Sequence, residues 1–135
     1  MIKVFDLLSS SESKETRRMI YEEYCRLKKE GKPIIFDKTT AIKNEYDKLK
    51  SSFNFVSELI IDGSLDEELF FKIYGGKVIR VWEALEQNIL KDRISNPKSC
   101  ENFRILKERF MKRYSTENLP HIYCTEEKKN ELNIP

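Results

Sequence analysis

An apolar stripe in the middle of the chain places the strongest limit on the fold. Its members are spaced by 4, 3, 4, 3 and 4 residues, and since each helical residue turns by about 100°, they fall on one side of a single helix. The opposite side carries Lys43, Asp47 and Lys50. The pattern predicts either the central helix of a globular bundle or a coiled-coil seam, and its aromatic members favour the bundle. The stripe consists of Ile42, Tyr46, Leu49, Phe53, Val56 and Ile60.

Two segments with a helical pattern and a loop precede this helix in the sequence. Residues 2–8 can form one or two helical turns, and Ser9 with Glu12 matches the reciprocal capping pattern that starts many helices. A helix is therefore predicted over residues 9–30. Residues 34–36, an Ile-Ile-Phe run, have no evident partner strand, so they are expected to form an apolar loop packed on the bundle.

Three more helices are predicted after the stripe, at residues 64–74, 77–94 and 98–114. Ser64, with Glu67 three residues on, is expected to cap the first of them. The pair Gly75-Gly76 is expected to end that helix in a tight turn, since glycine adopts backbone angles that other residues avoid. The residues expected to face the core are Leu65, Leu69 and Ile73 in the first helix and Val78, Trp82, Leu85 and Ile89 in the second.

Together these segments predict an all-α helical bundle of about five helices, with a short N-terminal turn and an irregular C-terminal tail. Residues 1–115 are expected to form the bundle domain. Residues 116–135 hold two prolines and no sustained periodicity, so they are expected to form a loosely docked or disordered tail. Four glycines and four prolines in 135 residues are too few for a turn-rich β architecture.

The middle of the chain resembles a known family. The residues that carry the resemblance read Phe53-x-x-Val56-x-x-Leu59-Ile60-x-Asp62-Gly63-x-Leu65-Asp66-x-x-Leu69, then Tyr74-Gly75, Val78-Ile79-Arg80-x-Trp82, Ile89 and Arg93. They are similar to a prokaryotic domain family of unknown function, in which a glycine turn precedes a helix with an Arg-x-Trp element. The match covers roughly the middle third of the chain, with weaker similarity at residues 17–21. The resemblance implies an all-helical fold and no particular activity.

Charge and cysteine content indicate an ordinary cytoplasmic domain. The 25 Lys and Arg against 23 Asp and Glu give a net charge of +2, which favours neither a nucleic-acid partner nor an anionic membrane. No apolar run approaches the roughly 20 residues that span a bilayer, and the first residues do not form a secretory signal. Cys25, Cys100 and Cys124 are widely spaced and indicate no disulfide framework. Reduced thiols and a cytoplasmic location without a membrane partner are therefore predicted.

Two groups of basic residues are the candidate interaction sites. Arg80, two residues before Trp82, is predicted either to pair with an acid such as Glu83 or one in residues 58–68, or to bind a carboxylate or phosphate. The segment 98–114 has six positive and two negative charges, which suit either a solvated helix face or a phosphate-binding surface. The candidate interaction surface consists of Arg80, Arg104, Lys107, Arg109, Lys112 and Arg113.

No catalytic, cofactor or metal site is predicted. Glu117, His121 and Cys124 are close enough in sequence to suggest a zinc site, but Pro120 interrupts a regular helix there, and zinc sites use closely paired ligands in a defined framework. The leading hypothesis is a non-enzymatic helical module that docks a partner protein or a second copy of itself. The alternative hypothesis is weak nucleic-acid binding through the basic helix at 98–114.

Overall fold

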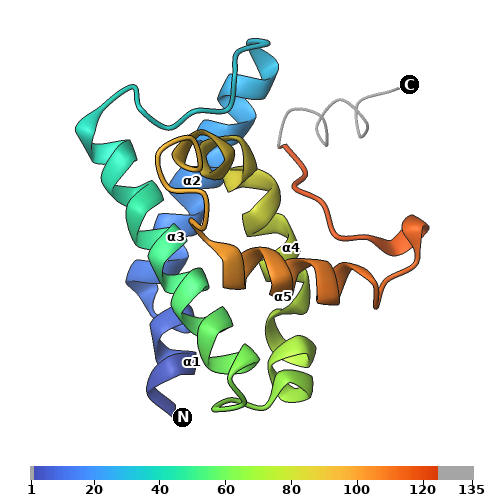
Figure 1. The fold of residues 1–135 in the computed structure, drawn as a ribbon. Coiled ribbons are helices and arrows are strands. Elements are labelled where there is room, and N and C mark those ends of the chain that lie inside the picture. The colour runs from blue at the N-terminus through green and yellow to red at the C-terminus, as the bar shows by residue number, and fades with distance from the viewer. Residues whose placement is uncertain (1, 125–135) are drawn as a thin grey trace.

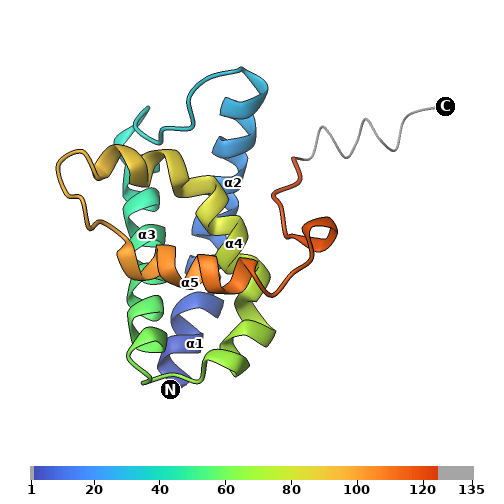
Figure 2. The ribbon, with the colours of Figure 1, turned by 45° about the vertical axis from the view of Figure 1, so that its right-hand side comes forward.

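The computed structural model describes residues 2–124, and within them it contains five α-helices, one 3-10 helix and no strand. The elements are α1 (Ile2–Ser9), α2 (Ser11–Lys29), α3 (Thr40–Ile61), α4 (Glu67–Asp92), α5 (Glu101–Met111) and the 3-10 helix η1 (Thr116–Asn118). Figures 1 and 2 show α2, α3 and α4 side by side, with α5 lying across α3 and α4. The predicted all-α bundle is therefore confirmed. In this part of the chain, no helix is both long and apolar enough to cross a membrane.

The apolar stripe of α3 forms the centre of the core. The ring of Phe53 lies 5.6 Å from that of Phe103 on α5, and Phe103 meets Trp82 of α4 edge-on, with 5.1 Å between the ring centroids. Helices of the same chain therefore cover the stripe, and the bundle interpretation is confirmed over the coiled-coil seam. The stripe residues exposed by at most 4% are Tyr46, Leu49, Phe53, Val56 and Ile60.

The loop between α2 and α3 is packed on the bundle, as predicted. Ile34 and Phe36 are buried. The side-chain amide of Asn88 on α4 accepts a hydrogen bond from the Phe36 N–H and donates one to the Ile34 carbonyl, both at 2.8 Å. Because buried backbone polar groups need partners, this amide allows the loop to be buried without a partner strand.

Two predicted helix starts are wrong by one or two residues. The cap of α2 is Ser10, not Ser9, because Ser10 has the extended backbone and its Oγ accepts the Ser13 N–H at 3.1 Å. The cap of α4 is Asp66, whose Oδ1 accepts the Leu69 N–H at 2.9 Å. The predicted cap Ser64 lies in the preceding turn, where its N–H is bound by Asp62.

The predicted turn at Gly75-Gly76 is also wrong, because α4 continues through both residues. A Cβ on Gly75 would lie 2.7 Å from the Phe71 ring and 3.1 Å from Tyr114 Oη, so this glycine permits close packing rather than a turn. A Cβ on Gly76 would lie 3.2 Å from a guanidinium nitrogen of Arg80.

The continuity of α4 reverses the predicted inner face of its first half. A single helix must keep one phase, and the buried residues Val78 and Leu85 fix that phase for the preceding turns. Phe70 therefore points inward and is 1% exposed. Leu69 and Ile73, predicted to face the core, point outward and are 45% and 49% exposed.

The last helix is shorter than the predicted 98–114. Cys100 has a left-handed backbone (φ 57°), which prevents a regular helix from running through it, so α5 begins at Glu101. The chain leaves the helix after Met111 and continues through η1. It then runs back past α4 (Figure 1) as far as Cys124. The remaining part of the predicted tail, residues 125–135, lies outside the described residues.

Replacing Gly75 with alanine is expected to lower the free energy of unfolding by about 1–3 kcal/mol, because the added Cβ overlaps the Phe71 ring. Gly76→Ala is the matched control. Its Cβ meets only the flexible end of Arg80, so the gain in helix propensity of up to about 1 kcal/mol should prevail. Urea unfolding followed by circular dichroism measures both variants. Equal effects of the two substitutions would contradict the packing role of Gly75.

Candidate functional site

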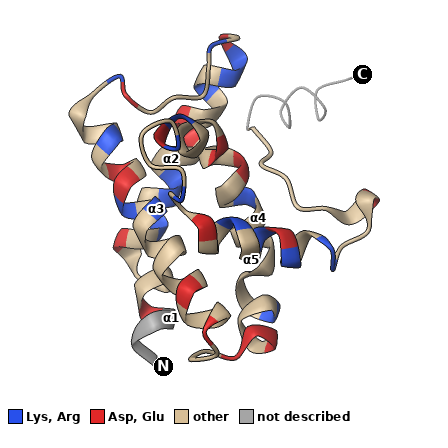
Figure 3. Cartoon of the chain, in the orientation of Figure 1, with Lys and Arg blue, Asp and Glu red and all other residues tan. Residues whose placement is uncertain are grey.

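The predicted basic surface on α5 is largely neutralised within the protein. Arg104 pairs with Glu101 at 2.5 Å and with Glu108 at 2.8 Å, one turn of helix away on either side. Figure 3 shows basic and acidic residues alternating along α5. Such i, i+3 and i, i+4 pairs support a solvated helix and leave less charge free for phosphate groups.

Arg109 of α5 and Arg113, two residues after its end, attach this part of the chain to α4. Arg109 pairs with Glu67 at 2.9 Å and Arg113 with Glu68 at 2.7 Å. The guanidinium of Arg113 also lies 3.8 Å above the centre of the Phe71 ring. The ammonium of Lys107 lies 5.0 Å above the Trp82 ring, a cation–π contact. Of the predicted basic residues between positions 104 and 113, only Lys112 is exposed and has neither an ion pair nor a cation–π contact among the described residues.

Arg80 belongs to a different surface, where α4 faces α2. Lys77 lies one turn before it on α4, and the electrostatic neighbours of the Lys77 ammonium are Arg80 together with Arg17 and Lys14 of α2. We call these four residues the cationic cluster. No described carboxylate lies within 4.0 Å of any of the four, so the predicted ion pair of Arg80 is not formed.

The charges of the cationic cluster have no carboxylate partner among the described residues, although the Lys77 ammonium lies 5.4 Å above the Tyr74 ring. Arg17 is only 6% exposed, yet its guanidinium donates to a carbonyl oxygen of Leu8 at 2.7 Å and to the hydroxyl of Ser13 at 3.0 Å, both of them neutral acceptors. Partial burial lowers the pKa of Lys77, and the positive charges of Arg17, Arg80 and Lys14 lower it further. An anion bound among these side chains would relieve that repulsion.

A buried hydroxyl lies beside the cluster. The Oη atom of Tyr21 on α2 is inaccessible to solvent and has no hydrogen-bond partner among the described residues. Burial raises the pKa of Tyr21 to about 12, although the charges of Arg80 and Arg17 and the approach of the Arg80 guanidinium to the hydroxyl act in the opposite direction. Tyr21 is therefore neutral at physiological pH, and its hydroxyl lies next to Arg80.

Tyr21 and Arg80 form one side of an open cleft of about 630 Å³. Residues 117–123 form the other side, and we call this space the tail cleft. Its volume is in the range of small-molecule sites, and its lining holds one guanidinium, that of Arg80, and one carboxylate, that of Glu117. An anionic group in this cleft would contact Arg80.

Glu83 of α4 holds the segment that closes the tail cleft. Its Oε1 accepts the N–H of Ile122 at 3.0 Å, its Oε2 accepts the hydroxyl of Tyr24 at 3.3 Å, and His121 Nδ1 lies 3.9 Å from the same carboxylate. Ile122 is buried. Residues 115–124, which we call the tail segment, are thus docked on α4 by both apolar and polar contacts.

A disulfide between Cys25 on α2 and Cys124 fixes the end of the tail segment. The prediction that these two thiols are reduced is therefore wrong. The two residues are 99 positions apart, and spacing along the sequence gives no sign that the chain returns to α2. The bond also removes Cys124 from the zinc site considered above, and no group of three metal-binding side chains occurs in residues 2–124. Cys100 is the free cysteine, and burial raises the pKa of its thiol.

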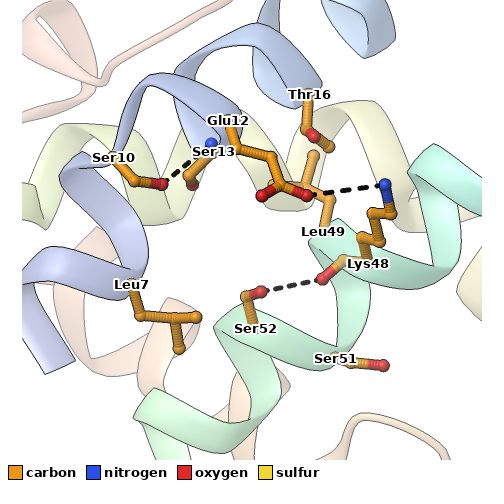
Figure 4. Close-up of a pocket in the computed structure, with 9 residues that line it drawn as sticks. All are labelled: Leu7, Ser10, Glu12, Ser13, Thr16, Lys48, Leu49, Ser51 and Ser52. Carbon is orange, nitrogen blue, oxygen red and sulfur yellow. Dashed lines mark hydrogen bonds and ion pairs between the residues drawn. The ribbon is translucent and has the colours of Figure 1, made fainter. Parts of the chain in front are cut away.

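A second cleft, of about 370 Å³ between α1–α2 and α3, offers less for a ligand (Figure 4). Most of its polar groups are already bound within the protein. Ser52 Oγ donates to the Lys48 carbonyl at 2.8 Å, Thr16 donates to Glu45 at 2.6 Å, and Lys48 lies 3.7 Å from Glu12. The tail cleft is therefore the better candidate site.

Sequence reasoning found Arg80 but missed the residues around it. The signal was present on α2, where Lys14, Arg17 and Tyr21 follow the i, i+3, i+7 spacing of one helix face. It was obscured because acids are interleaved there and because the predicted break at Gly75-Gly76 left Lys77 at a helix end.

Comparison with known protein families identifies the family of this chain. A model of the DUF4760 family matches residues 2–110, which is most of the chain. The chain belongs to the DUF4760 family. DUF4760 is described as a domain of unknown function, so the resemblance to an uncharacterised domain family is confirmed. The DUF4760 match includes the cationic cluster and ends before the tail segment. No curated protein and no solved structure matches the chain.

Lys77→Met is expected to raise the free energy of unfolding at pH 7. Because folding lowers the pKa of Lys77, the protonated ammonium is disfavoured in the folded chain, and this cost disappears as the pH rises above its ordinary pKa of 10.5. The stability gain should therefore shrink between pH 7 and pH values near 10.5. Lys72→Met, at an exposed position of the same helix, should show no such gain. Chemical unfolding across this pH range measures both, and a loss of stability at pH 7 in Lys77→Met would contradict the repulsion.

Proposed function

We propose that this domain is a non-enzymatic interaction module that docks a partner protein by an anionic group, a carboxylate or a phosphate. The observation that supports this proposal is the cationic cluster, four positive side chains without a carboxylate partner among the described residues, beside the unpartnered hydroxyl of Tyr21. Guanidinium groups bind carboxylates and phosphates through paired hydrogen bonds, so Arg80 is the principal contact in this proposal.

The surface next to the cluster supports a polypeptide partner. Leu69, Ile73 and Lys77 are spaced by four residues, so exposed apolar and cationic side chains share one face of α4. A partner segment that carries acidic and apolar residues side by side would match this face. A second copy of the chain can supply such a segment, and for this reason self-association remains part of the proposal.

Nucleic-acid binding through α5 has less support. Arg104, Arg109 and Arg113 are each paired with glutamates of the same chain, so a bound phosphate would have to displace those carboxylates. Affinity for a polyanion grows with the number of phosphates that are neutralised, and few free cations are left on this helix.

We further propose a cytoplasmic location, where thiols of the cell would exchange with the Cys25–Cys124 disulfide.

Titration with inorganic phosphate at constant ionic strength tests the anion site. Isothermal calorimetry is expected to show binding that weakens roughly tenfold or more in Arg80→Gln, because a charge-assisted hydrogen bond contributes about 1.5–3 kcal/mol. Lys72→Gln is the matched control, since it removes an exposed positive charge from the same helix outside the cluster, and should bind as the parent chain does. Equal loss in both variants would mean that phosphate responds only to net charge.

The class of partner is tested with the same variants. A hexaglutamate peptide is expected to bind more tightly than phosphate and to lose affinity in Arg80→Gln. Light scattering over a range of protein concentrations tests self-association. If a mixed-sequence oligonucleotide binds instead, and binding falls in an Arg109→Glu, Arg113→Glu variant but not in Arg80→Gln, the nucleic-acid alternative replaces this proposal.

A further inference from the structure

The tail segment supplies most of the tail cleft. The bundle contributes Tyr21 and Arg80, whereas every other residue around the cleft belongs to the run 117–123. Without that run, Arg80 would lie on an open surface in contact with water. Enclosure between the bundle and the tail segment strengthens interactions between charges, since less water screens them. The position of the tail segment therefore decides whether Arg80 faces a cleft or bulk solvent.

Apart from the disulfide, Ile122 and the contacts with Glu83 hold the end of the tail segment. Tyr123, next to Cys124, is 76% exposed, and His121 is exposed as well. Ile122 is buried and its N–H is bound by Glu83. Covalent attachment at Cys124 limits the movement of these residues, since a short segment anchored at both ends has little conformational freedom.

The disulfide can be reached from solvent. Cys25 is partly exposed and lines a third cleft, of about 590 Å³, which Tyr123 also lines. Arg18 and Arg26 also line this cleft, where Glu22 and Glu30 pair with them, so access for a thiol depends on the exposure of Cys25 and not on the charge of the lining. A small thiol can therefore attack the sulfur of Cys25 without unfolding of the bundle.

We propose that the Cys25–Cys124 disulfide is a redox latch that keeps the tail segment in place and thereby controls anion binding in the tail cleft. Two molecules of a low-molecular-weight thiol such as glutathione reduce it. The first attacks the sulfur of Cys25 and releases Cys124 as a thiolate, which takes up a proton. The second resolves the mixed disulfide, so that Cys25 and Cys124 end as thiols and the reductant as its own disulfide. This inference rests on the proposed anion site.

Linkage makes the latch reciprocal. If the oxidised chain binds an anion more tightly than the reduced chain, the bound anion must make the disulfide harder to reduce by the same factor. Couplings between two sites in proteins are typically about 5- to 150-fold. We expect the lower part of this range, because Arg80 and Tyr21 stay on the bundle after the tail segment is released.

The test compares oxidised and reduced full-length protein. Calorimetry with inorganic phosphate, with and without dithiothreitol, is expected to show about fivefold or greater weakening on reduction. Hydrogen exchange at the Ile122 amide should accelerate on reduction even without phosphate. In glutathione buffers, phosphate should shift the equilibrium towards the disulfide by the same factor as the change in affinity.

Cysteine variants separate the latch from general effects of a reductant. A Cys25→Ser, Cys124→Ser chain should bind phosphate as weakly as the reduced parent and ignore dithiothreitol. Cys100→Ser removes the free thiol and should keep the redox response of the parent chain. Circular dichroism verifies that each variant has retained the helical fold.

The possible failures are distinguishable. Unchanged exchange at Ile122 after reduction would overturn the latch whether or not phosphate binds. Faster exchange with equal phosphate affinity in both redox states would overturn the control of binding and leave the anion site standing. Absence of phosphate binding in the oxidised and reduced chains alike would reject the proposed anion site, and this inference with it.

Discussion

The contact of Phe103 with Phe53 and Trp82 holds the three principal elements of this fold together. Helix α5 reaches the bundle through this one aromatic ring at its start and through Phe110 near its end, both fully buried. Aromatic pairs of this kind contribute packing beyond the area they bury. The Phe103 N–H is bound by Asn54 of α3 at 3.2 Å. The crossing of α5 over α3 and α4 thereby fixes where the chain emerges towards the tail segment.

The unbroken course of α4 determines the candidate site. Gly75 allows Phe71 and Tyr114 to pack closely against the helix, and the helix continues in one phase to Arg80 and beyond. That phase directs Lys77 and Arg80 towards α2, where they meet Arg17. The cationic cluster is thus a result of core packing on the opposite side of the same helix.

Local patterns predicted much of this fold and little of the site. Regular apolar spacing was sufficient to predict α3, because a stripe of this length and period fits only a helix. The pair Gly75-Gly76 misled the interpretation of α4, since glycine serves both for turns and for close contacts and only the neighbouring ring of Phe71 decides between them. Capping serines and aspartates within a few residues of one another compete for the same role, so the helix starts were misplaced.

Contacts between distant parts of the chain were beyond such patterns. Arg17 and Lys77 lie far apart in sequence, and the Cys25–Cys124 bond joins residues 99 positions apart. Nothing in the spacing of these residues indicates their partners, because the packing of α2 on α4 brings Arg17 to Lys77 and the path of the chain after α5 brings Cys124 to Cys25. Arg109 and Arg113 illustrate the converse, since a strongly basic segment is neutralised by glutamates from another helix.

Helix α4 has opposite electrostatic surroundings in its first turn and near its middle. Glu67 and Glu68, in its first turn, attract the arginines of α5, whereas Lys77 and Arg80 repel the basic residues of α2. Dissolved ions weaken both effects, so salt loosens the attachment of α5 while it eases the strain between α2 and α4. The melting temperature of the whole chain can therefore be nearly independent of ionic strength, even though both of these parts of α4 respond to it.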